Sequence, residues 1–326
     1  MTVTALPISA HPAVEGGLQL EVTKVVPQTE SIVSITLADP SGRQLPSYVP
    51  GSHLVVQYGE EGVNAYSLTG SGNAPSEYSI SVLRVEGGAG GSVAMHQLAV
   101  GDRVYVSRPR SAFAPATTAT HHLLIAAGIG ITPVLSHAQA AADRGMTSSL
   151  IYVYRPGAGA HVDEARELLG PALTECSDRD SFQKVLTEQL QAQSLGTHLY
   201  VCGPNAFMDS VLDQACELGW PSARLHSEAF GAAELEEGEP FRVSLVRSGL
   251  ELEVPAGVSL LETLEKAGKR IPNMCRKGIC GECVLPVLRG TPQHRDLYLT
   301  EEEKADNTTM MCCVSRSEDP ELELDL

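Results

Sequence analysis

Five cysteines crowd the last fifth of the chain, and their spacing suits an iron–sulfur site. Cys275, Cys280 and Cys283 form a Cys-x4-Cys-x2-Cys run, and Cys312 and Cys313 follow about 30 residues later. Three thiolates on one short loop and a distant fourth can ligate the two irons of a [2Fe–2S] cluster. A structural zinc site is the alternative, but zinc favours paired Cys-x2-Cys knuckles. The spacing therefore predicts a [2Fe–2S] cluster.

A glycine-containing turn between an apolar strand and a helix could hold a pyrophosphate. We expect the strand over His122–Ala127 and the helix over Pro133–Arg144. Glycines let a phosphate approach the backbone, and a helix N-terminus offers unpaired amide groups. With Thr132 as N-cap and Pro133 as the first helical residue, the turn predicts a nicotinamide dinucleotide site that includes Gly128, Ile129, Gly130, Thr132 and Pro133. A plain strand–turn–helix without a ligand is the alternative.

Two further strand ends point to the same site. Ligands of open α/β sheets lie beyond the carboxyl ends of the strands. The strand expected over His198–Cys202 leads into Gly203 and Pro204, so we expect Cys202, Gly203 and Pro204 to face the glycine turn. Arg155, after the strand at Ser149–Tyr154, could meet the ribose of the nucleotide. Simple packing for Cys202 and a surface ion pair for Arg155 are the alternatives.

A flavin site is predicted at the end of an earlier strand. The Tyr66 ring can cover a flavin ring, and the Ser67 hydroxyl can hydrogen-bond its reactive nitrogen. An arginine and a Gly-Gly-Ser run suit a phosphate, because guanidinium and successive amide groups bind anions. The candidate flavin-binding residues are Tyr66, Ser67, Leu68, Val82, Arg84, Gly90, Gly91, Ser92 and Phe230.

Changes in sequence pattern divide the chain into domains. After a flexible tail at residues 1–16, short strands separated by Gly and Pro predict an antiparallel β-barrel, the flavin domain, over residues 17–115. Apolar strands alternating with helices predict a parallel α/β sheet, the NAD domain, over residues 116–230. A polar linker at 231–239 leads to a small α+β domain at 240–326 that carries the cysteines.

Composition narrows the class of protein. The chain has 326 residues, 43% hydrophobic content and a formal net charge of −17, which is typical of an acidic globular protein. Nucleic acids and anionic membranes favour cationic surfaces, so neither is expected as a partner. Because no signal peptide and no membrane-spanning stretch are visible, we expect a cytoplasmic protein with reduced thiols, and a monomer. His121 and His122, which open a strand, are expected to be solvated.

The cysteine loop resembles a known module. The run from Pro272 to Cys283 looks like the cluster loop of plant-type ferredoxins, which have a β-grasp fold. The run from Cys313 to Arg316 resembles the ending of that family, in which Cys-x-Ser-Arg carries the fourth ligand. The resemblance implies that Cys312 is a buried neighbour and that the ligands are Cys275, Cys280, Cys283 and Cys313.

The order of the remaining motifs resembles the ferredoxin–NADP⁺ reductase superfamily. Tyr-Ser-Leu, Gly-Gly-Ser, Gly-Ile-Gly-Ile-Thr-Pro, Cys-Gly-Pro and Glu-Ala-Phe follow one another in that order. With the ferredoxin module at the C-terminal end, the chain from about residue 17 is similar to the phthalate dioxygenase reductase family. This resemblance implies FMN, NADH as the substrate and a Rieske-type oxygenase as the partner. Electrons would pass from NADH to the flavin and then singly to the cluster.

One departure from the family pattern concerns the flavin phosphate. The family usually carries an arginine just before Tyr-Ser, where this chain has Val63, Asn64 and Ala65. Arg84 or the segment Arg108–Arg110 could take its place, so FAD is the alternative to FMN. A lack of paired arginines after the second sheet strand predicts NADH over NADPH. The alternatives for function are a reductase for a cytochrome P450 or another acceptor, and a non-enzymatic redox sensor.

Overall fold

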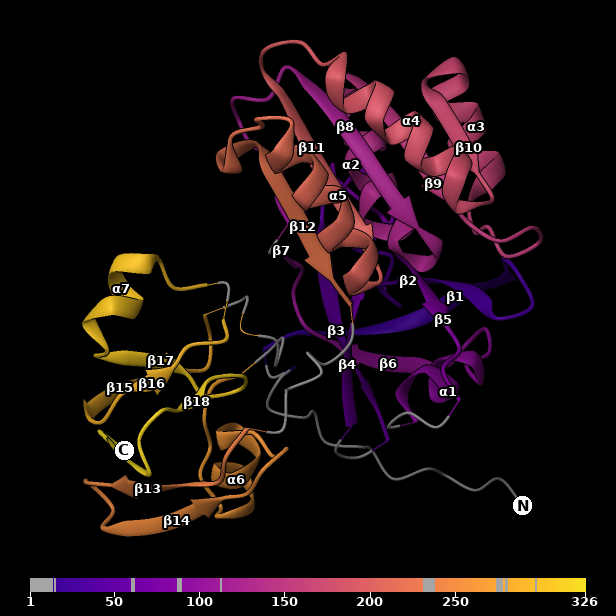
Figure 1. The fold of residues 1–326 in the computed structure, drawn as a ribbon. Coiled ribbons are helices and arrows are strands. Elements are labelled where there is room, and N and C mark those ends of the chain that lie inside the picture. The colour runs from indigo at the N-terminus through magenta and orange to yellow at the C-terminus, as the bar shows by residue number, and fades with distance from the viewer. Residues whose placement is uncertain are drawn as a thin grey trace, which may run out of the picture. The chain divides into compact units, whose positions relative to one another are not determined.

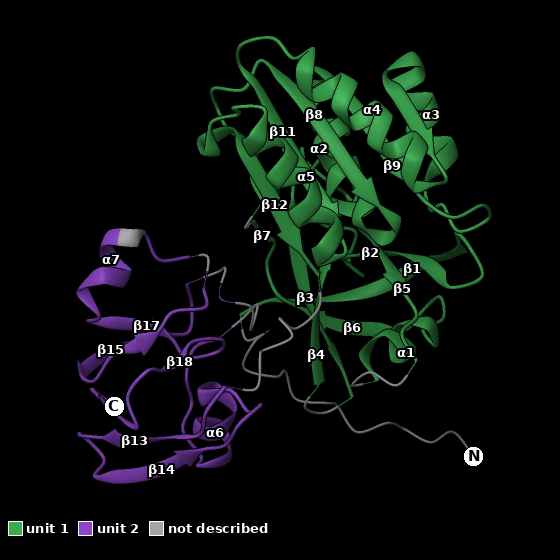
Figure 2. Cartoon of the chain, viewed as in Figure 1, with its two compact units in different colours: residues 1–230 green, residues 231–326 purple. Residues whose placement is uncertain are grey.

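The structure is a computed structural model that describes residues 14, 16–59, 62–86, 90–111, 113–230, 238–273, 278, 281–296 and 298–326. Most of the predicted tail at 1–16 and of the predicted linker at 231–239 lies outside these residues. The chain divides into two compact units, residues 1–230 and 231–326 (Figure 2). The first unit holds both the barrel and the parallel sheet.

The barrel is an antiparallel sheet with the strand order β4–β3–β6–β1–β2–β5, and β7 pairs with β3. A bridge between Leu68, directly after β4, and Ile80 of β5 brings the two ends of this order together. Alternate side chains fill the interior, and the short helix α1 (Gly91–His96) adds Met95 to this core. The strands are β1 (Leu18–Pro27), β2 (Ile32–Ala38), β3 (Ser52–Tyr58), β4 (Gly62–Ser67), β5 (Glu77–Leu83), β6 (Arg103–Val106) and β7 (Arg110–Ser111).

The second half of this unit is a parallel sheet in the order β10–β9–β8–β11–β12. Its strands are β8 (His121–Ala127), β9 (Thr147–Val153), β10 (Leu173–Cys176), β11 (Thr197–Gly203) and β12 (Leu225–Ala229). Nearly every residue of β8 and β11 is buried, because helices cover both faces of the sheet (Figure 1). These helices are α2 (Ile131–Asp143), α3 (Val162–Leu169), α4 (Arg179–Gln191) and α5 (Asn205–Glu217), with short 3-10 turns at Gly128–Gly130, Gly170–Ala172 and Ser222–Arg224.

Each face of the parallel sheet has its own apolar core. On one face, Leu124 of β8 and Tyr152 of β9 pack with Val134 of α2 and Ala165 of α3. On the other face, residues of β8, β9 and β11 pack against α4 and α5, as the buried side chains Leu123, Ile125, Ile151, Leu199, Val201, Phe182, Leu186, Met208 and Val211 show. The predicted antiparallel barrel and parallel α/β sheet are therefore confirmed.

The second unit has the mixed sheet of a β-grasp fold, in the order β14–β13–β19–β15–β17. Strands β13 and β19 pair in parallel, and the other neighbours are antiparallel. The strands are β13 (Phe241–Leu245), β14 (Leu250–Val254), β15 (Val284–Arg289), β16 (Pro292–Gln293), β17 (Thr309–Met311), β18 (Arg316–Ser317) and β19 (Glu321–Leu324), and the helices are α6 (Leu260–Lys266) and α7 (Glu301–Asp306). No described helix is long and apolar enough to cross a membrane.

The prediction that His122 is solvated is wrong. Its side chain is 3% exposed, and neither ring nitrogen has a hydrogen-bond partner among the residues that the structure describes. Because α2 covers this face of β8, the His122 ring packs 4.9 Å from the ring of Tyr200 and 5.9 Å from that of His137. Burial lowers the pKa of His122 to about 4 and that of His137 to about 3, so both rings are neutral at pH 7.

These buried rings predict a loss of stability in acid. In the unfolded chain a histidine binds a proton near pH 6.5, whereas the folded His122 resists it until about pH 4. The stability that depends on the neutral ring is therefore complete above pH 6.5 and is lost as the pH falls towards 4, at about 1.4 kcal/mol per pH unit. We expect His122→Phe to flatten the decline of melting temperature between pH 6.5 and 4. We expect His121→Gln, at a half-buried ring, to flatten this decline less than His122→Phe does. An unchanged pH profile in His122→Phe would contradict this account.

Candidate functional site

The glycine turn lies against the end of β11. Gly128 has φ +53°, a left-handed conformation that favours glycine. A Cβ on Gly130 would lie 2.2 Å from the carbonyl oxygen of Cys202, so only glycine lets the turn come this close to the strand. The structure thus brings the turn and the Cys202–Pro204 segment together at the carboxyl edge of the sheet, where ligands of such sheets bind.

The predicted capping role of Thr132 is wrong. Helix α2 begins at Ile131 with Gly130 in the N-cap position and no side-chain cap, because the 3-10 turn runs directly into the helix. Thr132 therefore lies within the first turn, where its hydroxyl donates to the carbonyl of Ile129 at 3.1 Å. Pro133, predicted as the first helical residue, also lies in this first turn, where a missing amide proton costs little.

The other predicted nucleotide-binding residues differ in accessibility. The Cys202 side chain is fully buried against α2, whereas Pro204 is exposed and begins α5. A ligand at this edge can therefore reach Pro204, whereas Cys202 and Gly203 are both buried. Arg155 is exposed, just beyond β9. Next to it, the Tyr154 hydroxyl hydrogen-bonds to Glu175, whose pKa the Arg166 guanidinium lowers.

Tyr66 and Ser67 end β4 where the barrel meets the parallel sheet. The Ser67 hydroxyl donates to Oε2 of Glu228 in β12 at 3.4 Å, and both residues are buried. This contact joins the strand that carries predicted flavin residues to the sheet that carries predicted nucleotide residues. Burial raises the pKa of Tyr66 to about 12, so its hydroxyl keeps its proton and accepts a hydrogen bond from Nδ2 of Asn64 at 3.4 Å.

Asn64 lies beside the predicted phosphate segment. A Cβ on Gly91 would stand 2.3 Å from Nδ2 of Asn64, so the start of α1 lies directly beside the end of this side chain. The position that is arginine in the family pattern is therefore next to Gly90 and Gly91. A longer cationic side chain at Asn64 would reach the same segment.

The remaining flavin candidates are engaged within the protein. Leu68 and Val82 lie in the barrel core. The Arg84 guanidinium pairs with Glu86 at 2.7 Å, on the surface. The Ser92 hydroxyl accepts a hydrogen bond from the Val85 amide at 3.1 Å, and Phe230 packs against the core beneath α2. Any contact of Ser92 with a phosphate would therefore use its backbone amide.

Two of the four predicted cluster ligands are described, and they meet. The sulfur atoms of Cys283 and Cys313 are 3.0 Å apart, and the amide of Gly278 donates to the Cys313 sulfur at 3.3 Å. Backbone N–H groups aimed at sulfur stabilise thiolates, as an iron–sulfur site requires. Cys275 and Cys280 lie outside the described residues. The donor set that is present fits the predicted cluster.

Cys312 has the surroundings of a packing residue. It is fully buried, and its hydrogen bond to Cys283 together with burial raises its pKa, whereas hydrogen bonds from Cys312 and Cys313 lower that of Cys283. A buried neutral thiol beside a thiolate is what the predicted division of roles requires.

Gly281, in the predicted cluster loop, lies close to Tyr298. A Cβ on Gly281 would lie 2.3 Å from the half-exposed ring of Tyr298.

The sequence did not predict a role for Glu228. Glu228 is the first residue of the Glu-Ala-Phe motif, but only Phe230 of this motif is predicted as a site residue. The contact with Ser67 spans 161 residues of sequence, so no local pattern could reveal it.

Comparisons with known proteins identify the family of the chain. Residues 103–225 match the model for "Dimethylamine monooxygenase subunit DmmA-like, N-terminal domain", and residues 243–318 match the "2Fe-2S iron-sulfur cluster binding domain". The chain is 37% identical over 327 residues to phthalate dioxygenase reductase of Burkholderia cepacia, which covers 97% of this chain and 99% of that protein. A solved structure of phthalate dioxygenase reductase covers 97% of this chain and all of that one, with 35% identity and a TM-score of 0.76. The chain belongs to the phthalate dioxygenase reductase family.

Another relative is a subunit of a heme-dependent demethylase. The chain is 44% identical over 284 residues to the heme-dependent oxidative N-demethylase beta subunit of Ectopseudomonas mendocina, which covers 86% of this chain and 90% of that protein. The relatives are reductase subunits of monooxygenase, dioxygenase and demethylase systems, and this member of the family is an oxidoreductase of that kind. The match to the cluster-binding domain confirms the predicted [2Fe–2S] type.

Proposed function

We propose that the chain takes electrons from NADH through FMN and its [2Fe–2S] cluster to a Rieske-type non-haem iron oxygenase. The contact between Ser67 and Glu228 carries this proposal, because it joins the predicted flavin strand to the predicted nucleotide sheet. A bound flavin would accept a hydride from NADH, and with the cluster it would supply the means to pass this electron pair on one electron at a time. A cytoplasmic location and a monomeric state remain predictions.

In this proposal the protein orients its cofactors rather than acting as an acid or base. The turn at Gly128–Gly130 and the first turn of α2 would bind the pyrophosphate, and Gly203 and Pro204 would border the nicotinamide. Tyr66 would cover the flavin ring, and the Ser67 hydroxyl would hydrogen-bond it. Cys283 and Cys313, with Cys275 and Cys280, would hold the cluster.

The class of acceptor is the second question. The relative in Ectopseudomonas mendocina is named for a heme-dependent demethylase, and a self-sufficient cytochrome P450 monooxygenase contains a region 32% identical to 94% of this chain. A haem-dependent oxygenase is therefore the second candidate. Reconstitution of the purified chain with one oxygenase of each class, with product formation as the readout, separates the two.

Nucleotide preference and metal content test the reductase itself. Arg155 lies just beyond β9, and the Arg166 guanidinium is already paired with Glu175 at 2.8 Å, so we expect no arginine pair to bind a 2′-phosphate there. We expect two irons and one FMN per chain, and a much higher kcat/KM for NADH than for NADPH with an artificial acceptor. Zinc in place of iron in anaerobically prepared protein, or equal use of both nucleotides, would contradict the proposal.

Asn64→Arg is expected to tighten FMN binding. The flavin phosphate is a dianion, and Asn64 lies beside Gly91 in the predicted phosphate segment. A charge-assisted contact contributes about 1.5–3 kcal/mol, which corresponds to roughly ten- to a hundredfold in Kd. Titration of apo-protein with FMN and FAD measures the change, with Asn64→Gln as the uncharged control. Unchanged affinity would mean that another residue already holds the phosphate, and preference of the wild type for FAD would overturn the FMN assignment.

A further inference from the structure

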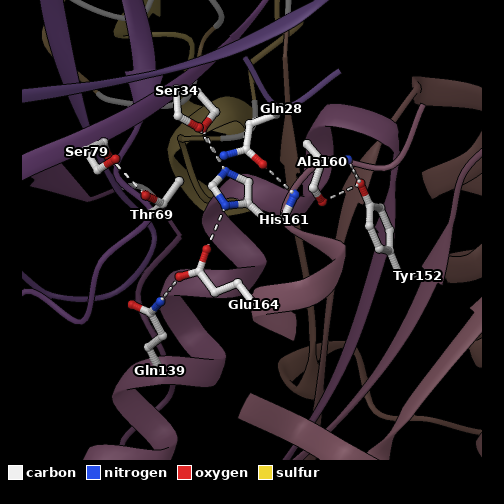
Figure 3. A network of polar contacts seen from close by, with 10 residues as sticks. Gln28, Ser34, Thr69, Ser79, Gln139, Tyr152, Ala160, His161 and Glu164 are labelled. Carbon is white, nitrogen blue, oxygen red and sulfur yellow. Dashed lines mark hydrogen bonds and ion pairs between the residues drawn. The ribbon is translucent and has the colours of Figure 1, made fainter. Parts of the chain in front are cut away.

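A buried histidine connects the barrel to the parallel sheet. His161 lies just before α3, in the connection from β9, and is 8% exposed. Its φ of +56° is a left-handed conformation that a non-glycine residue adopts at a cost. This cost is tolerated where the surroundings hold the residue in place. Figure 3 shows that polar groups from several elements converge on its ring and backbone.

On one side, the His161 ring is bound to the barrel. Its Nε2 lies 2.7 Å from the hydroxyl of Ser81 in β5, and this hydroxyl lies 2.7 Å from that of Ser34 in β2. The two serines are directly opposite each other in the β2–β5 pairing, and both are buried. The His161 amide also donates to Oε1 of Gln28, directly after β1, at 3.2 Å. With the Ser34 hydroxyl 3.5 Å from Nε2, three contacts hold His161 against the barrel wall.

On the other side, the ring is connected to α2 through Glu164 of α3. Its Nδ1 lies 2.7 Å from Oε2 of Glu164, whose Oε1 accepts a hydrogen bond from Nε2 of Gln139 in α2 at 2.6 Å (Figure 3). A carboxylate at Nδ1 favours the tautomer with the proton on Nδ1, so that Nε2 accepts from the Ser81 hydroxyl. Helix α2 begins directly after the glycine turn. The ring thus links the barrel to the helix that would bind the pyrophosphate.

The residue before His161 reaches the turn itself. The amide of Ala160 donates to the Tyr152 hydroxyl at 3.1 Å, and this hydroxyl lies 3.1 Å from the Gly128 carbonyl and 3.2 Å from the Ala160 carbonyl. Tyr152 is fully buried, and burial raises the pKa of its hydroxyl, which therefore remains a donor. Two sets of hydrogen bonds, joined by the covalent chain between Ala160 and His161, therefore connect Ser34 in the barrel to Gly128 in the turn.

We propose that His161 is a positioning residue that fixes the Gly128 turn relative to the flavin barrel. This inference rests on the proposed binding of NADH at that turn. A turn that is already held in place binds the pyrophosphate without a further cost of ordering, so a turn that can shift should bind NADH more weakly. The left-handed backbone at His161 is stabilised by contacts to both halves of the unit, so loss of either set should let the turn shift.

The order Ser81–His161–Glu164 also resembles a hydrolytic triad, but the surroundings exclude that role. Ser81 is 4% exposed, and its hydroxyl is engaged with Ser34 as well as with His161. A nucleophilic serine must reach a substrate. A positioning role is the one that this burial allows.

Two variants test the proposal on the purified flavin- and cluster-loaded protein. Ser81→Ala removes the hydroxyl that the ring contacts, and His161→Asn removes that ring while an asparagine still tolerates the left-handed backbone. The matched control is Thr69→Val, which deletes a hydrogen bond to the Ser79 carbonyl within the barrel alone (Figure 3). Steady-state reduction of ferricyanide by NADH gives KM and kcat, and anaerobic photoreduction checks the flavin without nucleotide.

We expect Ser81→Ala and His161→Asn to raise the KM for NADH about three- to tenfold, the loss that one hydrogen bond produces, with kcat changed less than twofold. The double variant should resemble the single ones, because both changes break the same connection. Thr69→Val should lower the melting temperature without changing KM. A wild-type KM in both variants, or an equal rise in Thr69→Val, would overturn the inference. A wild type that is photoreduced but not reduced by NADH would overturn the proposed function and this inference with it.

Discussion

Cys313→Ser is expected to abolish the electron paramagnetic resonance signal of the reduced [2Fe–2S] cluster. The sulfur of Cys313 lies 3.0 Å from that of Cys283 and accepts the Gly278 amide, as we expect of the fourth ligand. A serine hydroxyl is a harder and more basic donor than a thiolate and binds iron–sulfur clusters poorly. Electron transfer to an oxygenase should be lost, whereas ferricyanide reduction, which the flavin can support, should continue.

Cys312→Ser is the matched control, one residue away. The Gly278 amide donates to the sulfur of Cys313, the neighbour of the fully buried Cys312, so we expect the Cys312 thiol to pack rather than ligate. We expect this variant to keep the cluster signal and to lose about 1–3 kcal/mol of stability, the cost of burying a hydroxyl that lacks a good partner. Loss of the signal in Cys312→Ser and its survival in Cys313→Ser would move the ligand by one position.

Gly130→Ala should have the largest effect on nucleotide binding. The new Cβ would lie 2.2 Å from the oxygen and 2.5 Å from the carbon of the Cys202 carbonyl, so the turn and β11 must separate. Because this Cβ collides with backbone atoms of Cys202, no side-chain rotation can relieve the overlap. We expect the KM for NADH to rise more than tenfold and the melting temperature to fall, with the flavin still bound.

Gly128→Ala separates this collision from simple loss of a glycine. Gly128 has φ +53°, but an added Cβ would meet no atom within 4 Å. Its cost is the left-handed conformation alone, about 1–2 kcal/mol. Gly128→Ala should therefore impair binding less than Gly130→Ala. A Gly130→Ala protein with the KM of the wild type would mean that the turn does not hold the nucleotide.

The sequence revealed the fold class where local patterns were strong. Apolar runs such as His122–Ala127 are typical of buried parallel strands, and the structure has β8 over His121–Ala127. Helices α3 and α4 and strand β10 were not predicted. Helix α4 carries many polar residues, and β10 has four residues, so their patterns are weak. These three elements pack only when distant segments of the sheet come together.

The candidate site shows the same division. Gly130 and Cys202 were predicted separately from local motifs, but their close approach follows from the β8–β11 pairing. The burial of His122 depends on α2, which covers its strand, and a sequence pattern at a strand start does not show this. Glu228 and His161 act through contacts 161 and 80 residues away along the chain, with Ser67 and Ser81. Such contacts are products of tertiary packing.

Anaerobic titration of the purified protein with NADH tests the central claim most directly. Absorbance follows the flavin and electron paramagnetic resonance follows the cluster in the same samples. The account predicts that NADH alone reduces both centres, that NADPH does so far less effectively, and that Cys313→Ser retains only the flavin response. A flavin that NADH reduces while an intact cluster stays oxidised, or a protein that NADH does not reduce at all, would contradict it.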